Sequence, residues 1–278
     1  MPAVYAHRRF GGEVLAVCEN RTARAAIQRF PALYQIGLQG PDLLFYYNPL
    51  GANAYKDAGN AMHDAPAAPF FEAAARQVNG LAQGQAVLSY LLGFVCHFAL
   101  DSECHSYVEY EIQRTGHGHI AIETALEGAL MEADGVDWKT RNPAGYIVVN
   151  ETTARTIARV LPAGPKEVRT CLSNMKLVNR LLMPACGPKN YLTQRVLQLA
   201  GQWDTLGGLL IYALDRPAYA RSCARLEQLA EGAVPVALEL MDSLCAHIAS
   251  GAPLSERFNR TYGPVQALMD QYAAEENL

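Results

Sequence analysis

The stretch FVCHFALDSECH, residues 94–105, predicts a buried helix that carries polar side chains. His97, Asp101 and His105 follow one another at steps of four residues. On a helix with about 3.6 residues per turn, each such step advances about 40°, so the three side chains point into one narrow sector. Burying two imidazoles and a carboxylate together is costly unless a metal ion or a chain of hydrogen bonds satisfies them. A metal site and a hydrogen-bonded core are the two interpretations.

The same apolar periodicity extends along most of the chain and predicts an all-α fold. Apolar residues recur at spacings of three and four between Gly and Pro residues, and alternating β-branched patterns are scarce. The best strand candidate, 144–149, is expected to be a loop or the start of a helix. The predicted helices are 11–29, 69–83, 84–108, 117–133, 151–160, 165–183, 188–213, 217–248 and 254–274.

The histidines are concentrated in the first half of the chain. Six of the seven precede a segment rich in turn formers, 134–150. A chain of 278 residues can bury one large core. We therefore expect a single helical domain, 1–278, with a metal-binding half, 1–135, and a helical C-terminal extension, 136–278, that forms part of the pocket wall.

Composition and charge exclude several classes of protein. The net charge is −4, and no cluster of Lys and Arg would follow a phosphate backbone, so we expect no bulk nucleic-acid binding. The first 17 residues do not resemble a secretory signal, and no uncharged apolar run reaches the roughly 18 residues of a transmembrane helix. Seven scattered cysteines without a CxxC motif indicate reduced thiols. We therefore expect a cytoplasmic protein without a transmembrane segment.

A second polar pair extends the candidate site. His119 and Glu123 are again four residues apart, so they can offer one nitrogen and one oxygen to a single ion. Together with His105 they form a set of two nitrogens and one oxygen, which is a common zinc composition.

The remaining candidates suggest more than one ion. His63 and His97 could hold a second ion, and Asp101 could extend toward a third position near His7. Two or three divalent ions a few ångströms apart are suited to in-line displacement at phosphorus.

The order of these residues resembles the zinc-dependent phospholipase C family, all-helical enzymes with a trinuclear zinc cluster. It resembles more distantly the single-strand nucleases that share this fold. The matching elements lie between His7 and Glu123 and comprise GPD, MH, HxxxDxxxH and HxxxE. The resemblance implies an all-α multi-helix bundle of the phospholipase C and single-strand nuclease type. It also implies hydrolysis of phosphate esters.

The resemblance assigns eight site residues, namely His7, Asp42, His63, His97, Asp101, His105, His119 and Glu123. Asp101 would be the carboxylate that bridges two zinc ions, with His63 and His97 completing one of these sites. In the family the other is completed by a histidine, here His7, and by an N-terminal tryptophan. The chain begins Met-Pro-Ala, so we expect two or three zinc ions. Nitrogen and oxygen ligands also accept other divalent metals.

The family roles also cover the remaining four residues. His105, His119 and Glu123 would hold the third zinc. Asp42 matches the aspartate that acts as general base or orients the attacking water. It could also simply cap a helix beginning at Leu43.

The predicted function is zinc-dependent hydrolysis of phosphate esters, chiefly phosphodiesters, with a small phosphate ester or a phospholipid head group as substrate. Two alternatives stay open: nuclease- or phosphatase-type activity on the same cluster, and an inactive helical protein stabilised by zinc. The pair His63-Asp64 also resembles the HD dipeptide of metal-dependent phosphohydrolases. The order of the other histidines fits the phospholipase pattern more economically.

Overall fold

The computed structural model describes residues 4–78, 83–137, 140–182, 187–199, 201, 203 and 216–276. Every regular element in these ranges is a helix and none is a strand, which confirms the predicted all-α fold. The α-helices are α1 (Val4–Val17), α2 (Arg21–Arg29), α3 (Pro31–Gly37), α4 (Ala54–Asp64), α5 (Ala68–Val78), α6 (Gly84–Thr115), α7 (His119–Ala133), α8 (Glu151–Ile157), α9 (Pro165–Leu182), α10 (Gly187–Leu199), α12 (Ala220–Ser250) and α13 (Gln266–Glu276). The short 3₁₀ helices are η1 (Gly40–Tyr46), η3 (Arg216–Tyr219) and η4 (Glu256–Asn259).

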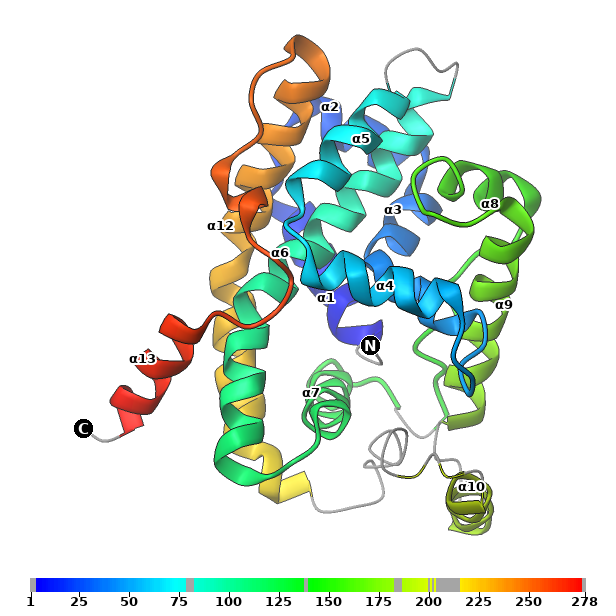
Figure 1. Cartoon of the computed structure of the whole chain (residues 1–278), viewed down its shortest axis with the longest axis vertical. Helices are drawn as coiled ribbons and strands as arrows, with labels where there is room; N and C mark the ends of the chain where they lie inside the picture. The colour runs from blue at the N-terminus through cyan, green and yellow to red at the C-terminus, as the bar shows by residue number, and fades with distance from the viewer. Residues whose placement is uncertain are drawn as a thin grey trace.

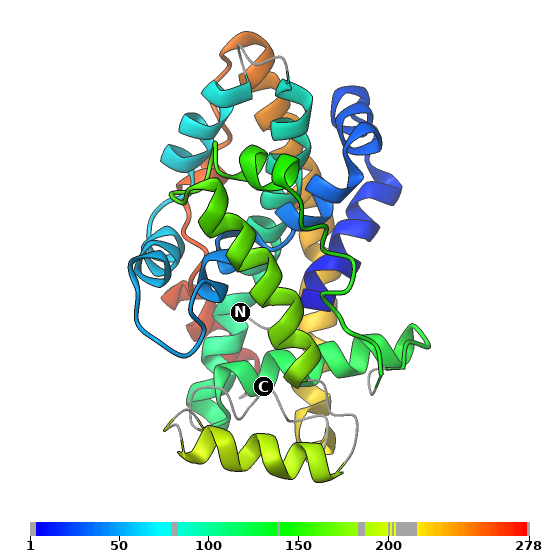
Figure 2. The ribbon, with the colours of Figure 1, turned by 90° about the vertical axis from the view of Figure 1, so that its right-hand side faces the viewer.

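The long helix α6 forms the centre of the bundle (Figure 1). All residues from 86 to 102 are buried, and a helix that is buried on every side must be enclosed by other helices. Helices α1, α2, α3, α5, α12 and α13 pack against it. Figure 2 shows α9 crossing another side of the molecule, with α10 below it.

In the part of the chain that the structure describes, two segments are long and apolar enough to cross a membrane by length and composition. They are Gly84–Thr115 and Pro217–Ser250. The most apolar window of the first is 89% buried inside the bundle, as expected of a core helix, and that of the second is 33% buried.

Close packing between α3 and α6 depends on two glycines. A Cβ atom at Gly37 would overlap the carbonyl oxygen of Tyr90, and one at Gly93 would overlap that of Tyr34. The hydroxyl of Ser89 donates a hydrogen bond of 2.8 Å to a carbonyl at the start of α3. The two helices are therefore held backbone to backbone, and the loop after α3 lies directly on α6.

We expect Gly93→Ala to destabilise the fold, because the overlapping atom belongs to backbone that cannot rotate away. Overpacking of this kind should lower the thermal midpoint by about 3–10 °C. Thermal denaturation followed by circular dichroism would measure the shift. Gly12→Ala is the matched control, since a Cβ at Gly12 meets no atom within 4 Å. An unchanged midpoint in Gly93→Ala would show that α3 can move away from α6.

The predicted helix 11–29 is wrong as a single element. The structure divides it into α1 and α2, and α1 begins earlier, at Val4. The side-chain oxygen of Asn20 accepts a hydrogen bond of 3.0 Å from the backbone N–H of Ala23. Asn is a strong N-cap residue, so a new helix starts here and the old one ends. The prediction also missed the helices between residues 31 and 64.

The predicted helix 254–274 is also wrong in its first half. The chain there forms the short η4, then a loop, and only from Gln266 the helix α13. Gly263 and Pro264 interrupt the periodic pattern, and the buried Phe258 and Tyr262 anchor an irregular segment to the core.

The other predicted helices agree with the structure to within a few residues, except that α6 extends to Thr115. Gly116 then ends α6 in the left-handed conformation, with φ 75°. The predicted helix 188–213 ends at Leu199, and Gly201 after it has φ 64°. Residues 200, 202 and 204–213 of this prediction, and 79–82 of the predicted helix 69–83, lie outside the described residues. The segment 144–149 is a loop, as expected.

Candidate metal centre

All eight predicted site residues lie where five elements converge. The residues are His7 on α1, Asp42 on η1, His63 on α4, His97, Asp101 and His105 on α6, and His119 and Glu123 on α7. Six of them are buried, whereas the side chains of His63 and His119 are 15% and 36% exposed. The cluster is thus enclosed by protein and reaches solvent through two imidazoles.

Asp101 lies at the centre of the cluster. Its Oδ2 is 3.1 Å from Nε2 of His97 and 3.8 Å from Nε2 of His63. Its Oδ1 is 3.4 Å from Nε2 of His7. His105 approaches Oδ2 to 3.9 Å through Nδ1. The two carboxylate oxygens face different histidines, which is the arrangement that a carboxylate bridging two ions requires.

Asp42 faces the same cluster from η1. Its Oδ1 lies 3.0 Å from Nε2 of His63. The turn before it passes directly over an imidazole, because Gly40 has φ 48° and a Cβ at this position would overlap the ring of His97. Asp42 is inside η1, which begins at Gly40, and does not precede a helix that starts at Leu43.

The third group lies between α6 and α7. Nε2 of His119 is 3.0 Å and Nε2 of His105 is 3.6 Å from the same carboxylate oxygen, Oε1 of Glu123. The centroids of the two imidazole rings are 5.3 Å apart. Two nitrogens and one oxygen therefore converge, as the i, i+4 spacing predicts.

Hydrogen bonds to backbone carbonyls orient three of the imidazoles. Because a carbonyl only accepts, the ring nitrogen Nδ1 must carry the proton, and Nε2 is left to face the cluster. Histidines that bind metals commonly donate their second N–H in this way. The three bonds run from His63 to Gly59 at 2.8 Å, from His97 to Leu38 at 3.2 Å and from His105 to Tyr262 at 2.6 Å.

Several buried polar atoms in the cluster make no hydrogen bond to the described part of the chain. They are Nδ1 of His7, Nε2 of His63 and His97, Oδ2 of Asp101 and Oε2 of Glu123. Buried polar atoms are nearly always satisfied, so five such atoms in one cluster need a common partner. Three of them, Nε2 of His63, Nε2 of His97 and Oδ2 of Asp101, approach one another or a carboxylate closely without hydrogen-bond geometry, as ligands converging on a cation do. The residues therefore fit a metal ion.

Among the described residues, three sets of donor atoms each lie close enough to hold an ion, and the two sets that share His97 cannot both use its Nε2 at once. Within each set the ligand atoms are no more than 4.8 Å apart. Nitrogen and carboxylate donors of this kind suit Zn²⁺. The sets are His63, His97 and Asp101, then His105, His119 and Glu123, and lastly His7, Asp42 and His97. The first two are the sets predicted from the sequence, whereas in the third His7 joins Asp42 in place of Asp101.

Mutual attraction shifts the pKa values of the third group. Burial alone would lower the pKa of His105, but the charges of Asp101 and Glu123 raise it to about 10. Burial alone would raise the pKa of Glu123, but His119 and then His105 lower it to about 2. Without a metal, therefore, His105 is protonated and Glu123 is ionised at neutral pH.

We expect zinc uptake at pH 7 to release protons, because zinc and a proton compete for Nε2 of His105. Above about pH 10 this imidazole would already be neutral, so it would release no proton when zinc binds. Titration calorimetry in buffers of different protonation enthalpy measures the number of protons released. His105→Gln should release about one proton fewer. If His105→Gln and the unaltered protein released the same number of protons, His105 would not be a zinc ligand that gives up a proton.

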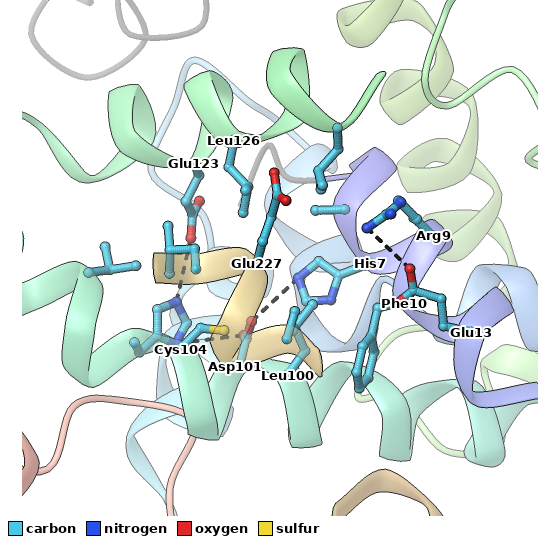
Figure 3. A pocket seen from close by; sticks show the side chains of 16 residues that line it. His7, Arg9, Phe10, Glu13, Leu100, Asp101, Cys104, Glu123, Leu126 and Glu227 are labelled. Carbon is cyan, nitrogen blue, oxygen red and sulfur yellow. Dashed lines mark ion pairs between the residues drawn. The ribbon is translucent and has the colours of Figure 1, made fainter. Parts of the chain in front are cut away.

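One side of the cluster borders a pocket between α1, α6, α7 and α12 (Figure 3). His7, Asp101, His105 and Glu123 line its polar end. Its other polar residues are Arg9, Glu13 and Glu227, and its apolar wall includes Phe10, Leu100, Leu126 and Leu226. Residues from α12 thus form part of a pocket whose polar end belongs to the first half of the chain.

Sequence reasoning missed several contributions to the site. Tyr262 acts through its carbonyl oxygen, and backbone groups leave no trace in a side-chain pattern. Glu13 and Glu227 reach the pocket from helices without a distinctive motif. Asp64 of the HD dipeptide is exposed and belongs to none of the three donor sets, so the structure does not favour that alternative.

Comparison with known proteins adds one match. Residues 6–168, more than half of the chain, match a family model described as zinc dependent phospholipase C. All eight clustered residues lie inside this segment. No curated protein and no solved structure matches the chain.

Proposed function

Because the chain belongs to the zinc-dependent phospholipase C family, we propose that it hydrolyses phosphate esters, chiefly phosphodiesters such as those that carry phospholipid head groups. The observation that carries this proposal is the position of Asp101, whose two oxygens face histidines from three different helices. Zinc would be held by donors among His7, Asp42, His63, His97, Asp101, His105, His119 and Glu123.

The chain's own groups have distinct tasks in such a reaction. Zinc, when bound, supplies positive charge for the phosphate oxygens and lowers the pKa of water toward neutrality. Asp42 would accept a hydrogen bond from the attacking water and take its proton. The carbonyls behind His63, His97 and His105 hold these rings in place.

We expect Asp42→Asn to lower kcat by about 10²- to 10⁴-fold, because an amide cannot take the proton. Hydrolysis rates and zinc content of the purified variant would be measured together. Retained zinc with lost activity supports the role of a base. A loss of zinc would instead make Asp42 chiefly a ligand, and unchanged activity would exclude both roles.

The decisive experiment for the function is a substrate panel. Zinc-loaded protein should hydrolyse a chromogenic phosphocholine diester faster than a phosphomonoester or single-stranded DNA. His247→Ala is the matched control, because His247 lies outside the cluster. Its Nδ1 is hydrogen-bonded to the carbonyl oxygen of Ala252 at 2.6 Å. Faster cleavage of the monoester would indicate a phosphatase, and faster cleavage of DNA would indicate a nuclease, in place of the proposed activity on phosphodiesters of lipids. A zinc-loaded, folded protein that cleaves none would be a zinc-stabilised protein without this activity.

A further inference from the structure

Helices α9 and α10 carry most of the exposed large hydrophobic side chains in the described residues. Six of the nine such side chains lie on these two helices, each 52% exposed or more. Scattered exposed hydrophobics are ordinary, whereas a concentration of them marks an interaction surface. The six are Leu177, Leu181, Tyr191, Leu192, Val196 and Leu199. We call them, with the exposed basic residues Lys166, Arg169, Arg180 and Arg195, the α9–α10 surface.

The orientation of α9 is fixed by its inner side. The side-chain amide of Asn174 donates hydrogen bonds of 2.9 and 3.1 Å to the carbonyls of Tyr46 and Tyr47, at the end of η1. Val168 and Met175 are buried on the same side. Spacings of three and four therefore place the exposed basic residues and leucines of α9 on one outward stripe.

Helix α10 repeats this mixture of apolar and basic residues. Its four exposed hydrophobics fall within a sector of about 140°, with Arg195 inside it. The guanidinium of Arg195 lies 5.6 Å from the centroid of the Tyr191 ring. Among residues 188–199, for which burial is described, only Leu197 is buried, and it lies on the opposite side. A hydrogen bond of 3.3 Å from Lys189 to the carbonyl of Arg180 joins the two helices.

The charge of this region differs from that of the chain. Residues 165–199 contain six Lys and Arg and one Glu, in a protein with 23 basic and 27 acidic residues. Helices that combine basic and apolar residues on an exposed face are typical of proteins that bind anionic membranes. A symmetric dimer through this surface would instead bring like charges together, which is unfavourable. Figure 2 shows that both helices lie on one side of the molecule.

We propose that the α9–α10 surface docks the protein on membranes that contain anionic phospholipid. The docking rests on exposure and charge and does not depend on the chemistry of the metal centre. Because the inner side of α9 holds η1, docking would bring the Asp42 segment to about one helix diameter, roughly 10 Å, from the lipid.

Vesicle sedimentation with the zinc-loaded protein tests the proposal. We expect binding to vesicles of phosphatidylcholine mixed with phosphatidylglycerol, weaker binding to phosphatidylcholine alone, and loss at high salt. Arg180→Gln with Arg195→Gln should weaken binding about 20- to 30-fold. Leu192→Ser with Val196→Ser should also weaken it. Matched controls are Arg76→Gln and Val17→Ser, exposed residues on α5 and α1.

Three outcomes would decide against the proposal. If the two double variants bound vesicles as well as the controls do, the lipid contact would lie elsewhere on the protein. If the unaltered protein bound no vesicles, membrane docking would be excluded. The protein could instead bind no vesicles and form a concentration-dependent dimer that the double variant Leu192→Ser with Val196→Ser abolishes. The α9–α10 surface would then be an interface between copies of the chain. Hydrolysis of a soluble diester is measured on the same variants. Unchanged hydrolysis with lost vesicle binding separates docking from catalysis.

Discussion

Asp101→Asn should reduce phosphodiester hydrolysis by at least about 10²- to 10³-fold, the effect of removing one group that organises charge in a reaction site. The carboxylate lies among four histidines, and the substitution removes its charge without changing its size. Burial alone would raise the pKa of Asp101, but His97 and then His105 hold it well below its usual range. The side chain is therefore an anion at any working pH, and an amide cannot replace it.

The same variant should lose bound zinc, which elemental analysis measures. Glu123→Gln should lose only the ion held between His105 and His119, so its zinc content should exceed that of Asp101→Asn. Asp64→Asn is the matched control, since this aspartate is exposed and outside the cluster. Full zinc content and full activity in Asp101→Asn would contradict the central role of the carboxylate.

Removal of zinc should lower the thermal midpoint of the protein by about 5–10 °C. An ion that binds only the folded state at about 100 times its Kd adds about 2.7 kcal/mol, and each kcal/mol shifts the midpoint of a chain this size by about 2–4 °C. Differential scanning calorimetry with and without a chelator measures the shift. Added zinc should reverse it.

The fold itself should survive chelation, because the core also contains many apolar side chains that bind no metal, Tyr90, Phe94 and Phe98 among them. Far-ultraviolet circular dichroism should therefore change little. The variant Asp101→Asn should respond less to the chelator than the unaltered protein. A chelator shift of equal size in both would mean that the stabilising ion binds elsewhere.

The sequence was informative where one physical signal dominated. Helix α6 was predictable because its apolar residues recur on every side, and its ligands because steps of four place His97, Asp101 and His105 in one sector. The pair His119–Glu123 followed from the same spacing. In each case the signal is local, so no knowledge of the tertiary structure was needed.

Other features depended on contacts between distant segments. The start of α2 at Arg21 could have been recognised from Asn20, but the apolar pattern continues past it and hides the break. The loop before α13 is held by burial of Phe258 and Tyr262, and the spacing of apolar residues in this segment does not predict that burial. The pairing of His7 with Asp42 likewise requires α1 and η1 to meet on α6.

The placement of three candidate ligands on the enclosed helix α6 has a kinetic consequence. Elements at the centre of a bundle open only when the whole molecule unfolds, whereas loops open locally and often. The backbone amides between His97 and His105 should therefore belong to the slowest-exchanging class in a deuterium-exchange measurement. The backbone positions that carry these side chains should then persist as long as the folded state does.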